Sequence, residues 1–450
     1  MNLHKKAFLC SMTALKNQKA ILKKLGIHAL NEMQQEAMHA IRNHTETVLL
    51  SPTGSGKTLA FLLPIITRLQ ADDRRVQVLV LVPSRELALQ IEQVAREMGA
   101  GIKVNAIYGG RPIGKDNQDL KHPPGILIGT PGRIADHFRR GSFDVGGIHT
   151  LVLDEFDKSL EVGFENEMQE IIEGLAELRS KVLTSATQAV EVPAFVGLKS
   201  PQEVNYLFKE QAQLQVEVVL SENKDKLQAL LSLLKHLGNA PGIVFCNFKD
   251  SIQRVSDYLN TNGIGHGCFY GGLEQKDRER ALIKFRNGTD QLLLATDLAA
   301  RGLDIPEIKF IIHYHLPHSA VEFTHRNGRT ARMHQEGTAY VLHWAQEELP
   351  EFIEELETTQ QQVEELAPAE TVSENWNTLF ISGGRKDKIS KGDIVGLFLK
   401  QAQLPKDALG VIELKQDCAF VSVKKDVAHL AIERVDNTRL KKKKVRVKVV

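Results

Sequence analysis

The glycine-rich stretch at residues 51–58 restricts the possible fold of this chain most. It reads Ser-Pro-Thr-Gly-Ser-Gly-Lys-Thr, follows an apolar run at 47–50 and precedes a helical pattern that begins at Leu59. Glycine at 54 and 56 lets the backbone approach phosphates closely, and the amides at a helix N-terminus donate to them. Lys57 would neutralise the β- and γ-phosphates, and the Thr58 hydroxyl would bind Mg²⁺. This order of strand, loop and helix predicts a nucleotide site; a glycine-rich turn that binds nothing is the alternative.

Short apolar runs alternate with helical patterns through most of the sequence. The runs at 47–50, 78–82, 125–128, 150–153 and 181–184 are continuous, as in the strands of a parallel sheet that is covered on both faces. The pattern restarts after about residue 210, with runs at 242–245, 291–294, 310–312 and 338–342. We therefore predict two consecutive α/β domains joined near 208–220. Residues 346–370 carry nine glutamates and no Lys or Arg, which predicts a terminal helix and then a polar linker.

Composition excludes several classes of protein. In 450 residues, 42% are hydrophobic and 25% charged, as in ordinary globular chains. No apolar run approaches the roughly 20 residues of a membrane helix, and polar residues interrupt the N-terminal apolar segment, so we expect neither a membrane span nor a signal peptide. The four cysteines are widely spaced and include no CxxC pair, which predicts neither a disulfide framework nor a zinc site. These features favour a cytoplasmic protein.

The last eighty residues differ in charge from the rest of the chain. Residues 371–450 contain 17 Lys and Arg against 9 Asp and Glu, a net charge of +8, whereas the other 370 residues carry 40 against 47, a net charge of −7. Apolar runs at 378–381, 410–414, 419–423 and 445–449, with helical patterns at 391–400 and 427–435, predict a β-α-β-β-α-β domain. A basic domain of this kind indicates a polyanionic partner; a merely solvated basic surface is the alternative.

A second chemical motif ends the apolar run at 150–153. The sequence Leu151-Val-Leu-Asp-Glu-Phe-Asp157 places three carboxylates after a strand, where ligands of open α/β sheets bind. Asp154 would hold Mg²⁺, usually through water, and Glu155 would orient and deprotonate an attacking water. Acidic residues in such a place are most often a helix cap. Paired with the glycine-rich loop about a hundred residues upstream, they favour catalysis.

These motifs resemble those of the DEAD-box ATP-dependent RNA helicases over nearly all of residues 8–332. The resemblance implies two tandem RecA-like parallel-sheet domains, at 1–208 and 209–366, and the cofactors ATP and Mg²⁺. It implies an ATP site with Gln34 reading adenine, Phe8 stacking on it, Asp304 contacting ribose, and the loop residues Ser51, Pro52, Thr53, Gly54, Ser55, Gly56, Lys57 and Thr58. Arg329 and Arg332 would reach the γ-phosphate from the second domain.

The same resemblance implies contacts to the RNA backbone and a coupling element. The implied RNA-binding residues are Pro83, Arg85, Gly110, Arg111, Thr130, Arg133, Gln275, Arg278 and Thr296. Asp157, Ser185 and Thr187 would link hydrolysis to RNA binding. Three positions depart from the family pattern: Phe156 replaces the usual Ala, Asn327 a usual Ile, and Ala331 a usual Gly. Phe156 needs a compensating pocket if coupling through Asp157 is to be kept.

Residues 367–450 form the third predicted domain, a small RRM-like α+β domain, and 375–450 resemble the RNA-binding domain of the DbpA subfamily. Phe380 could stack on a base as an RRM strand-one aromatic does, or could be a core residue of that strand. Cys418 stands where the RRM signature has an aromatic, which favours an atypical RNA surface that includes Arg385, Lys386 and Lys388. The resemblance implies recognition of structured rRNA and a role in large-subunit assembly.

The predicted function is therefore that of an RNA-dependent ATPase that separates or remodels RNA, acting as a monomer on RNA and not on a membrane. An RNA-binding, ATP-dependent clamp or scaffold with little unwinding activity is the alternative, and Phe156 would permit it. A DNA helicase of the same superfamily is a third class. It would usually lack Gln34 and the elements Pro83-Ser-Arg-Glu-Leu87 and Ser185-Ala-Thr187.

Overall fold

The computed structural model describes residues 17–187, 191–207, 214–297, 308–330, 337–369 and 376–450. The chain divides into two compact units between the strands β7 (Gln202–Asn205) and β8 (Leu214–Ser221). Phe8, Asp304, Ala331 and Arg332 lie outside the described residues, and so does the boundary predicted at 208/209. No helix in the described ranges is long and apolar enough to cross a membrane.

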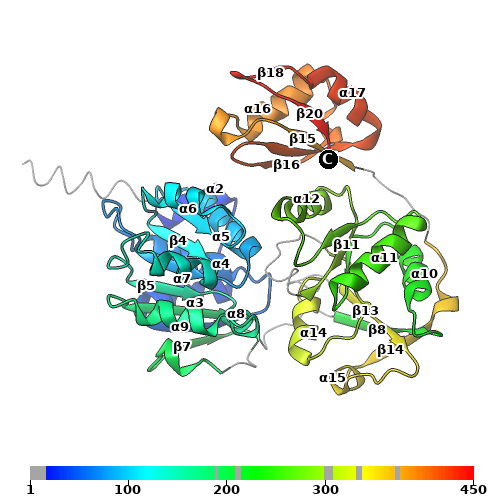
Figure 1. Cartoon of the computed structure of the whole chain (residues 1–450), viewed down its shortest axis with the longest axis horizontal. Helices are drawn as coiled ribbons and strands as arrows, with labels where there is room; N and C mark the ends of the chain where they lie inside the picture. Colours follow the sequence, from blue (N-terminus) through cyan, green and yellow to red (C-terminus); the bar gives the residue numbers. More distant parts are fainter. Residues whose placement is uncertain (1–16, 188–190, 208–213, 298–307, 331–336, 370–375) are drawn as a thin grey trace, which may run out of the picture. The chain divides into compact units, whose positions relative to one another are not determined.

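The first unit is built on a seven-stranded sheet in which every paired strand is parallel, in the order β3-β4-β2-β5-β6-β1-β7. Its strands are β1 (Glu46–Leu50), β2 (Val78–Leu81), β3 (Val104–Ile107), β4 (Ile126–Gly129), β5 (Thr150–Leu153), β6 (Ser180–Ser185) and β7 (Gln202–Asn205). Its helices (Figure 1) are α2 (Gln18–Leu25), α3 (Glu32–Asn43), α4 (Lys57–Ile66), α5 (Arg85–Met98), α6 (Ile113–Leu120), α7 (Pro131–Arg139), α8 (Phe156–Glu161) and α9 (Glu165–Glu173), and the 3₁₀ turn is η1 (Ala194–Val196).

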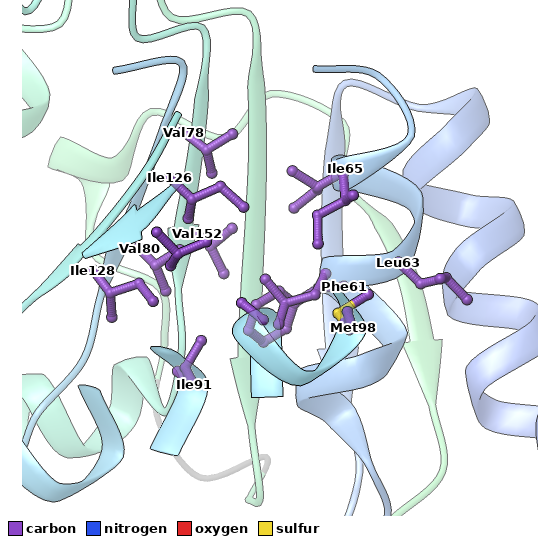
Figure 2. Close-up of a cluster of buried hydrophobic side chains, with 14 of the residues drawn as sticks. Phe61, Leu63, Ile65, Val78, Val80, Ile91, Met98, Ile126, Ile128 and Val152 are labelled. Carbon is purple, nitrogen blue, oxygen red and sulfur yellow. The ribbon is translucent and has the colours of Figure 1, made fainter. Parts of the chain in front are cut away.

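Alternate residues of the central strands fill two cores, one on each face of this sheet. Val78 and Val80 of β2 belong to the cluster with α4 and α5, whereas Leu79 and Leu81 belong to the cluster with α7 and α9. Figure 2 shows the first cluster, in which Phe61 of α4 lies near strand residues such as Val152. Since both faces of the strands are buried, their sequences are continuously apolar, as predicted.

The second unit contains another seven-stranded parallel sheet, in the order β10-β11-β9-β12-β13-β8-β14. The strands are β8 (Leu214–Ser221), β9 (Gly242–Phe245), β10 (Gly267–Phe269), β11 (Leu292–Ala295), β12 (Phe310–His313), β13 (Gly337–Trp344) and β14 (Thr358–Gln362). The helices are α10 (Leu227–Leu237), α11 (Lys249–Thr261), α12 (Gln275–Arg286), α14 (Ala320–Asn327), α15 (Glu351–Glu354) and the 3₁₀ turn η2 (Val363–Glu365).

The basic tail forms a four-stranded antiparallel sheet in the order β16-β17-β15-β20. Its larger elements are β15 (Trp376–Ile381), α16 (Lys391–Gly396), β16 (Leu409–Leu414), β17 (Ala419–Lys424), α17 (Lys425–Val435) and β20 (Val447–Val449). Its short elements are η3 (Arg385–Asp387), η4 (Leu397–Gln401), η5 (Lys406–Ala408), β18 (Arg439–Leu440) and β19 (Lys443–Lys444). The predicted β-α-β-β-α-β order and the predicted fold class are confirmed.

One predicted segment is wrong. Residues 346–369 form the four-residue helix α15, the edge strand β14, which pairs with β8, and the turn η2, instead of a long terminal helix. Pro350 stops the chain from entering a helix earlier, and the threonines at 358 and 359 favour a strand. The junction predicted near 208–220 extends from residues outside the described ranges into β8, which β13 and β14 flank on both sides.

Candidate functional site

The glycine-rich loop connects β1 to α4 in the first unit, as the sequence predicts. Gly54 and Gly56 have φ angles of 79° and 89°, in the left-handed region that favours glycine. A Cβ atom on Gly56 would lie 2.3 Å from the Gln34 side-chain nitrogen. The backbone conformation therefore favours glycine at 56, and the Gln34 side chain packs closely against it.

The Lys57 ammonium lies inside this loop. Lys57 is buried, and its Nζ donates to the carbonyls of Ser51 at 2.5 Å and Pro52 at 2.9 Å. Because the charge is held by loop carbonyls at the N-terminus of α4, the positive group and the helix dipole both favour an anion here. The arrangement fits the phosphates of a nucleotide.

The N-terminus of α3 is fastened to the same loop. Asn31 and Gln34 form a capping box, in which each side chain bonds to the backbone of the other residue. The Asn31 amide donates to the Ser55 carbonyl at 3.1 Å, and the Gln34 amide donates to the Gly56 carbonyl at 3.4 Å. The structure therefore brings Gln34 to the phosphate loop, while its role in reading adenine stays a prediction.

The acidic motif follows β5, which is separated from β1 by β6 in the sheet. Asp154 is buried and accepts a hydrogen bond from the Thr184 hydroxyl. Burial, and then the charge of Glu155, raise the pKa of Asp154 to about 6, and the Lys57 charge acts in the opposite direction. The carboxyl group is therefore held without enough positive charge around it, which suits a site that receives a cation.

Glu155 has a backbone conformation that is unusual for a residue with a side chain. Its φ of 50° places it in the left-handed region, where it begins α8. Its Oε2 is buried and has no hydrogen-bond partner in the part of the chain that the structure describes. A strained residue with an unsatisfied carboxylate oxygen is typical of a functional site. Asp154 and Glu155 together fit a Mg²⁺ ion with its waters.

Phe156, the departure in the acidic motif, has the compensating pocket that it needs. Its ring is buried and belongs to the apolar cluster around β5 and α9. The next residue, Asp157, keeps its partners. The Thr187 hydroxyl donates to Asp157 Oδ2 at 3.2 Å, and the Ser185 hydroxyl donates to the Thr187 carbonyl at 2.7 Å. The three residues predicted to couple hydrolysis to RNA binding are thus in contact.

Three arginines from separate predicted motifs converge near the loop at 108–111. Gly110 has a φ angle of 85°, in the left-handed region that favours glycine, and Arg85 Nη1 lies 2.5 Å from where its Cβ would be. Arg111 Nη1 donates to the Ala106 carbonyl at 3.0 Å, and Arg133 Nε donates to the Tyr108 carbonyl at 3.1 Å. The other predicted RNA-binding residues of this unit, Pro83 and Thr130, follow β2 and β4, which are neighbours in the sheet.

Asp116, which connects two of these arginines, and its partner His137 were missed by the sequence analysis. The fully buried Asp116 carboxylate pairs with Arg111 Nε at 3.3 Å and with Arg133 Nε at 3.4 Å. His137 Nε2 lies 3.3 Å from the same carboxylate. A charged residue on a short helix usually indicates a solvated face, so no local signal identified Asp116 as buried.

The predicted RNA-binding residues of the second unit lie along one edge of its sheet. Gln275 begins α12, and the Arg278 guanidinium lies over the Phe269 ring at 4.8 Å. Thr296 follows β11, and its amide donates to the Phe269 carbonyl at 3.3 Å. The structure therefore brings Arg278 and Thr296 to the carboxyl ends of adjacent strands.

Arg326 is a third residue that the sequence analysis missed. Its side chain is 1% exposed, and its Nε and Nη2 bind the Asp297 carboxylate at 2.6 and 2.5 Å. It also donates to Asn247 Oδ1 at 2.9 Å. Arg326 thus connects the segments after β9 and β11 to α14, which leads into Arg329, itself buried.

The departure at Asn327 also has a partner. Asn327 Oδ1 lies 3.0 Å from Nε2 of the buried His313. Burial and the charge of Arg326 lower the pKa of His313 to about 3, so its imidazole is neutral. Nε2–H can then donate to Asn327 while Nδ1 faces Arg326 Nη1 at 3.4 Å. An amide replaces the usual apolar side chain because a histidine lies opposite.

In the tail, Phe380 is not a core residue of its strand. Its neighbours Leu379 and Ile381 fill the core, whereas Phe380 is half-buried on the other face, with its centroid 5.6 Å from that of Phe420. Lys448 Nζ lies 6.0 Å from the ring centroid. Arg385, Lys386 and Lys388 lie in and just after the turn η3, next to Gly384. The surroundings of Phe380 fit stacking on a base, which stays a prediction.

A phosphate-binding loop, an acidic strand end and two parallel-sheet domains define the class of RecA-like ATPases. Three family models match the chain: DEAD/DEAH box helicase at 31–195, helicase conserved C-terminal domain at 225–334, and DbpA RNA binding domain at 378–449. The ATP-dependent RNA helicase DbpA of Escherichia coli is 31% identical over 95% of this chain and 96% of its own length. DbpA of Bacillus subtilis is 29% identical with the same coverage.

A solved structure of S. cerevisiae Dbp5 bound to RNA and ADP BeF3 is similar with a TM-score of 0.68 and 25% identity. The match covers 78% of this chain and 96% of that one. The chain belongs to the DEAD-box ATP-dependent RNA helicases, and its C-terminal domain is DbpA-like. It is an enzyme that uses ATP and binds RNA, as predicted.

Proposed function

We propose that this ATP-dependent RNA helicase separates or remodels a structured segment of ribosomal RNA during assembly of the large ribosomal subunit. It would act as a monomer in the cytoplasm, with Mg²⁺ accompanying ATP. The observation that carries the proposal is the basic domain at 376–450, which matches the DbpA RNA binding domain and follows a helicase core. The resemblance to the DbpA subfamily is the ground for the ribosomal target.

The residues of the first unit suggest how hydrolysis would proceed. Lys57 would neutralise phosphate charge, and Thr58 and Asp154 would hold Mg²⁺, which stabilises the charge that develops on the phosphates. The Glu155 carboxylate, whose buried Oε2 lacks a hydrogen-bond partner among the described residues, would orient and deprotonate the attacking water. Arg329, on the segment that Arg326 anchors, would supply further positive charge to the transition state.

Two groups of residues would bind the RNA backbone, so that unwinding itself does not depend on the RNA sequence. Arg85, Arg111 and Arg133 form one group, and Arg278 and Thr296 belong to the other. Target choice would then come from the tail. The contacts of Asp157 support a coupled motor rather than a passive clamp, because the buried Phe156 leaves the bond from Thr187 in place.

The test compares ATP hydrolysis by the full chain and by a chain that lacks residues 371–450. Stimulation by a large-subunit rRNA fragment and by a homopolymer is measured over a range of salt concentrations. Each phosphate that the tail neutralises contributes a log–log salt slope of roughly −0.7 to −0.9, so removing the tail should flatten the slope and abolish the preference for rRNA. Identical responses of both chains to both RNAs would refute the targeting role.

A further inference from the structure

At the carboxyl edge of the second sheet, the residues that follow β10, β11 and β9 lie side by side, because these strands are neighbours. Arg278 lies over the last residue of β10, Thr296 follows β11, and the chain leaves β9 at Cys246, whose amide donates to the Ala295 carbonyl at 2.9 Å. Neighbouring strands lie about 4.8 Å apart, so the end of β9 is about 10 Å from that of β10. If RNA contacts Arg278 and Thr296, the strand passes close to the residues that follow β9.

The residue that projects there is Phe248. Five large hydrophobic side chains are exposed among the residues that the structure describes; Phe248, at 61%, is the most exposed and the only aromatic of the five. It directly precedes α11, with an extended backbone at φ −126° and ψ 145°. An aromatic ring left in water at the edge that carries the predicted RNA contacts needs an explanation, whereas single exposed aliphatic residues elsewhere do not.

The position of the Phe248 ring is restricted by His315 and by the hydrogen bonds of the preceding residue, Asn247. The His315 ring packs against it in an edge-to-face arrangement, with centroids 6.1 Å apart and an interplanar angle of 69°. The preceding residue, Asn247, is fixed through its backbone amide to His315 Nδ1 at 3.2 Å, through its side chain to the Leu316 carbonyl at 3.0 Å, and by Arg326. Burial lowers the pKa of His315 to about 4, so its imidazole is neutral and can accept that bond. Phe248 is therefore preorganised with much of its surface open.

We propose that Phe248 is a stacking site for an unpaired nucleobase of the RNA strand that crosses this sheet edge. The inference rests on the proposed function, because it requires RNA to run along the carboxyl edge of the second sheet, past Arg278 and Thr296. A phenyl ring has no hydrogen-bonding group, so it can recognise a base only through its π-face, and every base has one. The site would bind any base and would hold one nucleotide out of a helical stack.

The experiment measures binding of single-stranded oligoadenylate, and of an abasic strand of the same length, to the full chain with a non-hydrolysable ATP analogue. Phe248→Ala should weaken binding of oligoadenylate by about 5- to 150-fold, from the 1–3 kcal/mol that alanine substitution at a stacking aromatic removes. It should leave binding of the abasic strand unchanged. Phe248→Trp should retain the affinity, because a larger ring stacks at least as well.

Leu356→Ala is the matched control. Leu356 is 38% exposed and lies next to β14, at the opposite end of the same sheet from β10. This variant should bind both strands like the wild type. Equal binding of oligoadenylate by Phe248→Ala and the wild type would overturn the proposal. It would favour a protein as the partner of the exposed ring. An equal loss on the abasic strand would overturn it too, because the ring would then contact the backbone. If the wild type bound neither strand, the proposed function itself would fail.

Discussion

Replacing Asp154 with asparagine should stabilise the ligand-free protein above pH 6. The fold raises the pKa of this buried carboxyl group from 3.8 to about 6, chiefly by burial and then by the charge of Glu155. The folded state therefore favours the protonated carboxyl group. The contribution of this group to the free energy of unfolding is fully present below about pH 4 and is lost as pH rises through about 6. A shift of about two pKa units corresponds to about 3 kcal/mol, by which the ionised Asp154 destabilises the first unit.

Asparagine resembles the protonated carboxyl group at every pH, and its oxygen can still accept the Thr184 hydroxyl. The free energy of unfolding, measured by urea titration without Mg²⁺ or nucleotide, should therefore exceed that of the wild type by about 3 kcal/mol at pH 8 and by only about 0.5 kcal/mol at pH 4. Adding Mg²⁺ with ATP should stabilise the wild type more than Asp154→Asn. A difference that does not grow between pH 4 and pH 6 would refute the reasoning.

Three further substitutions test the site. Glu155→Gln should keep ATP binding but lower turnover by about 10²–10⁴-fold, so near-normal phosphate release would exclude Glu155 as the water-activating residue. Asp116→Asn should weaken the buried pairing with Arg111 and Arg133 and lower the free energy of unfolding by about 3 kcal/mol; an unchanged urea midpoint would contradict the pairing. Asn327→Leu removes the acceptor of the buried His313 N–H and should lower stability by about 1–3 kcal/mol, and a neutral result would show that this bond is absent.

The strands of both sheets that are buried on two faces were predictable from the sequence, because their residues are continuously apolar. Edge strands were not. In β14 the residues Thr358–Gln362 are polar and mostly exposed, and the pairing with β8 that makes them a strand joins segments more than a hundred residues apart. The dense run of glutamates before them predicts a helix locally, and sheet pairing prevailed over that preference.

The residues of the candidate site also divide into those that the sequence predicts and those that it does not. The glycines of the phosphate loop and the acidic strand end were predictable, because each chemistry requires particular residues at a fixed spacing within a few positions. Asp116 and Arg326 were not, because their importance comes from partners distant in sequence. Arg326 contacts Asp297, 29 residues away, and Asn247, 79 residues away. Phe156 illustrates the same limit, since only the packing around it shows that the acidic motif tolerates a ring.

ATP-driven displacement of a labelled strand from an rRNA-derived duplex tests the central claim most directly. The full chain should release the strand from an RNA duplex when ATP and Mg²⁺ are present. Glu155→Gln should bind the duplex without releasing the strand at a comparable rate, because strand separation depends on completing the hydrolytic cycle. Release that is equally fast without ATP, or equally fast in Glu155→Gln, would contradict an ATP-dependent RNA helicase that works through this site.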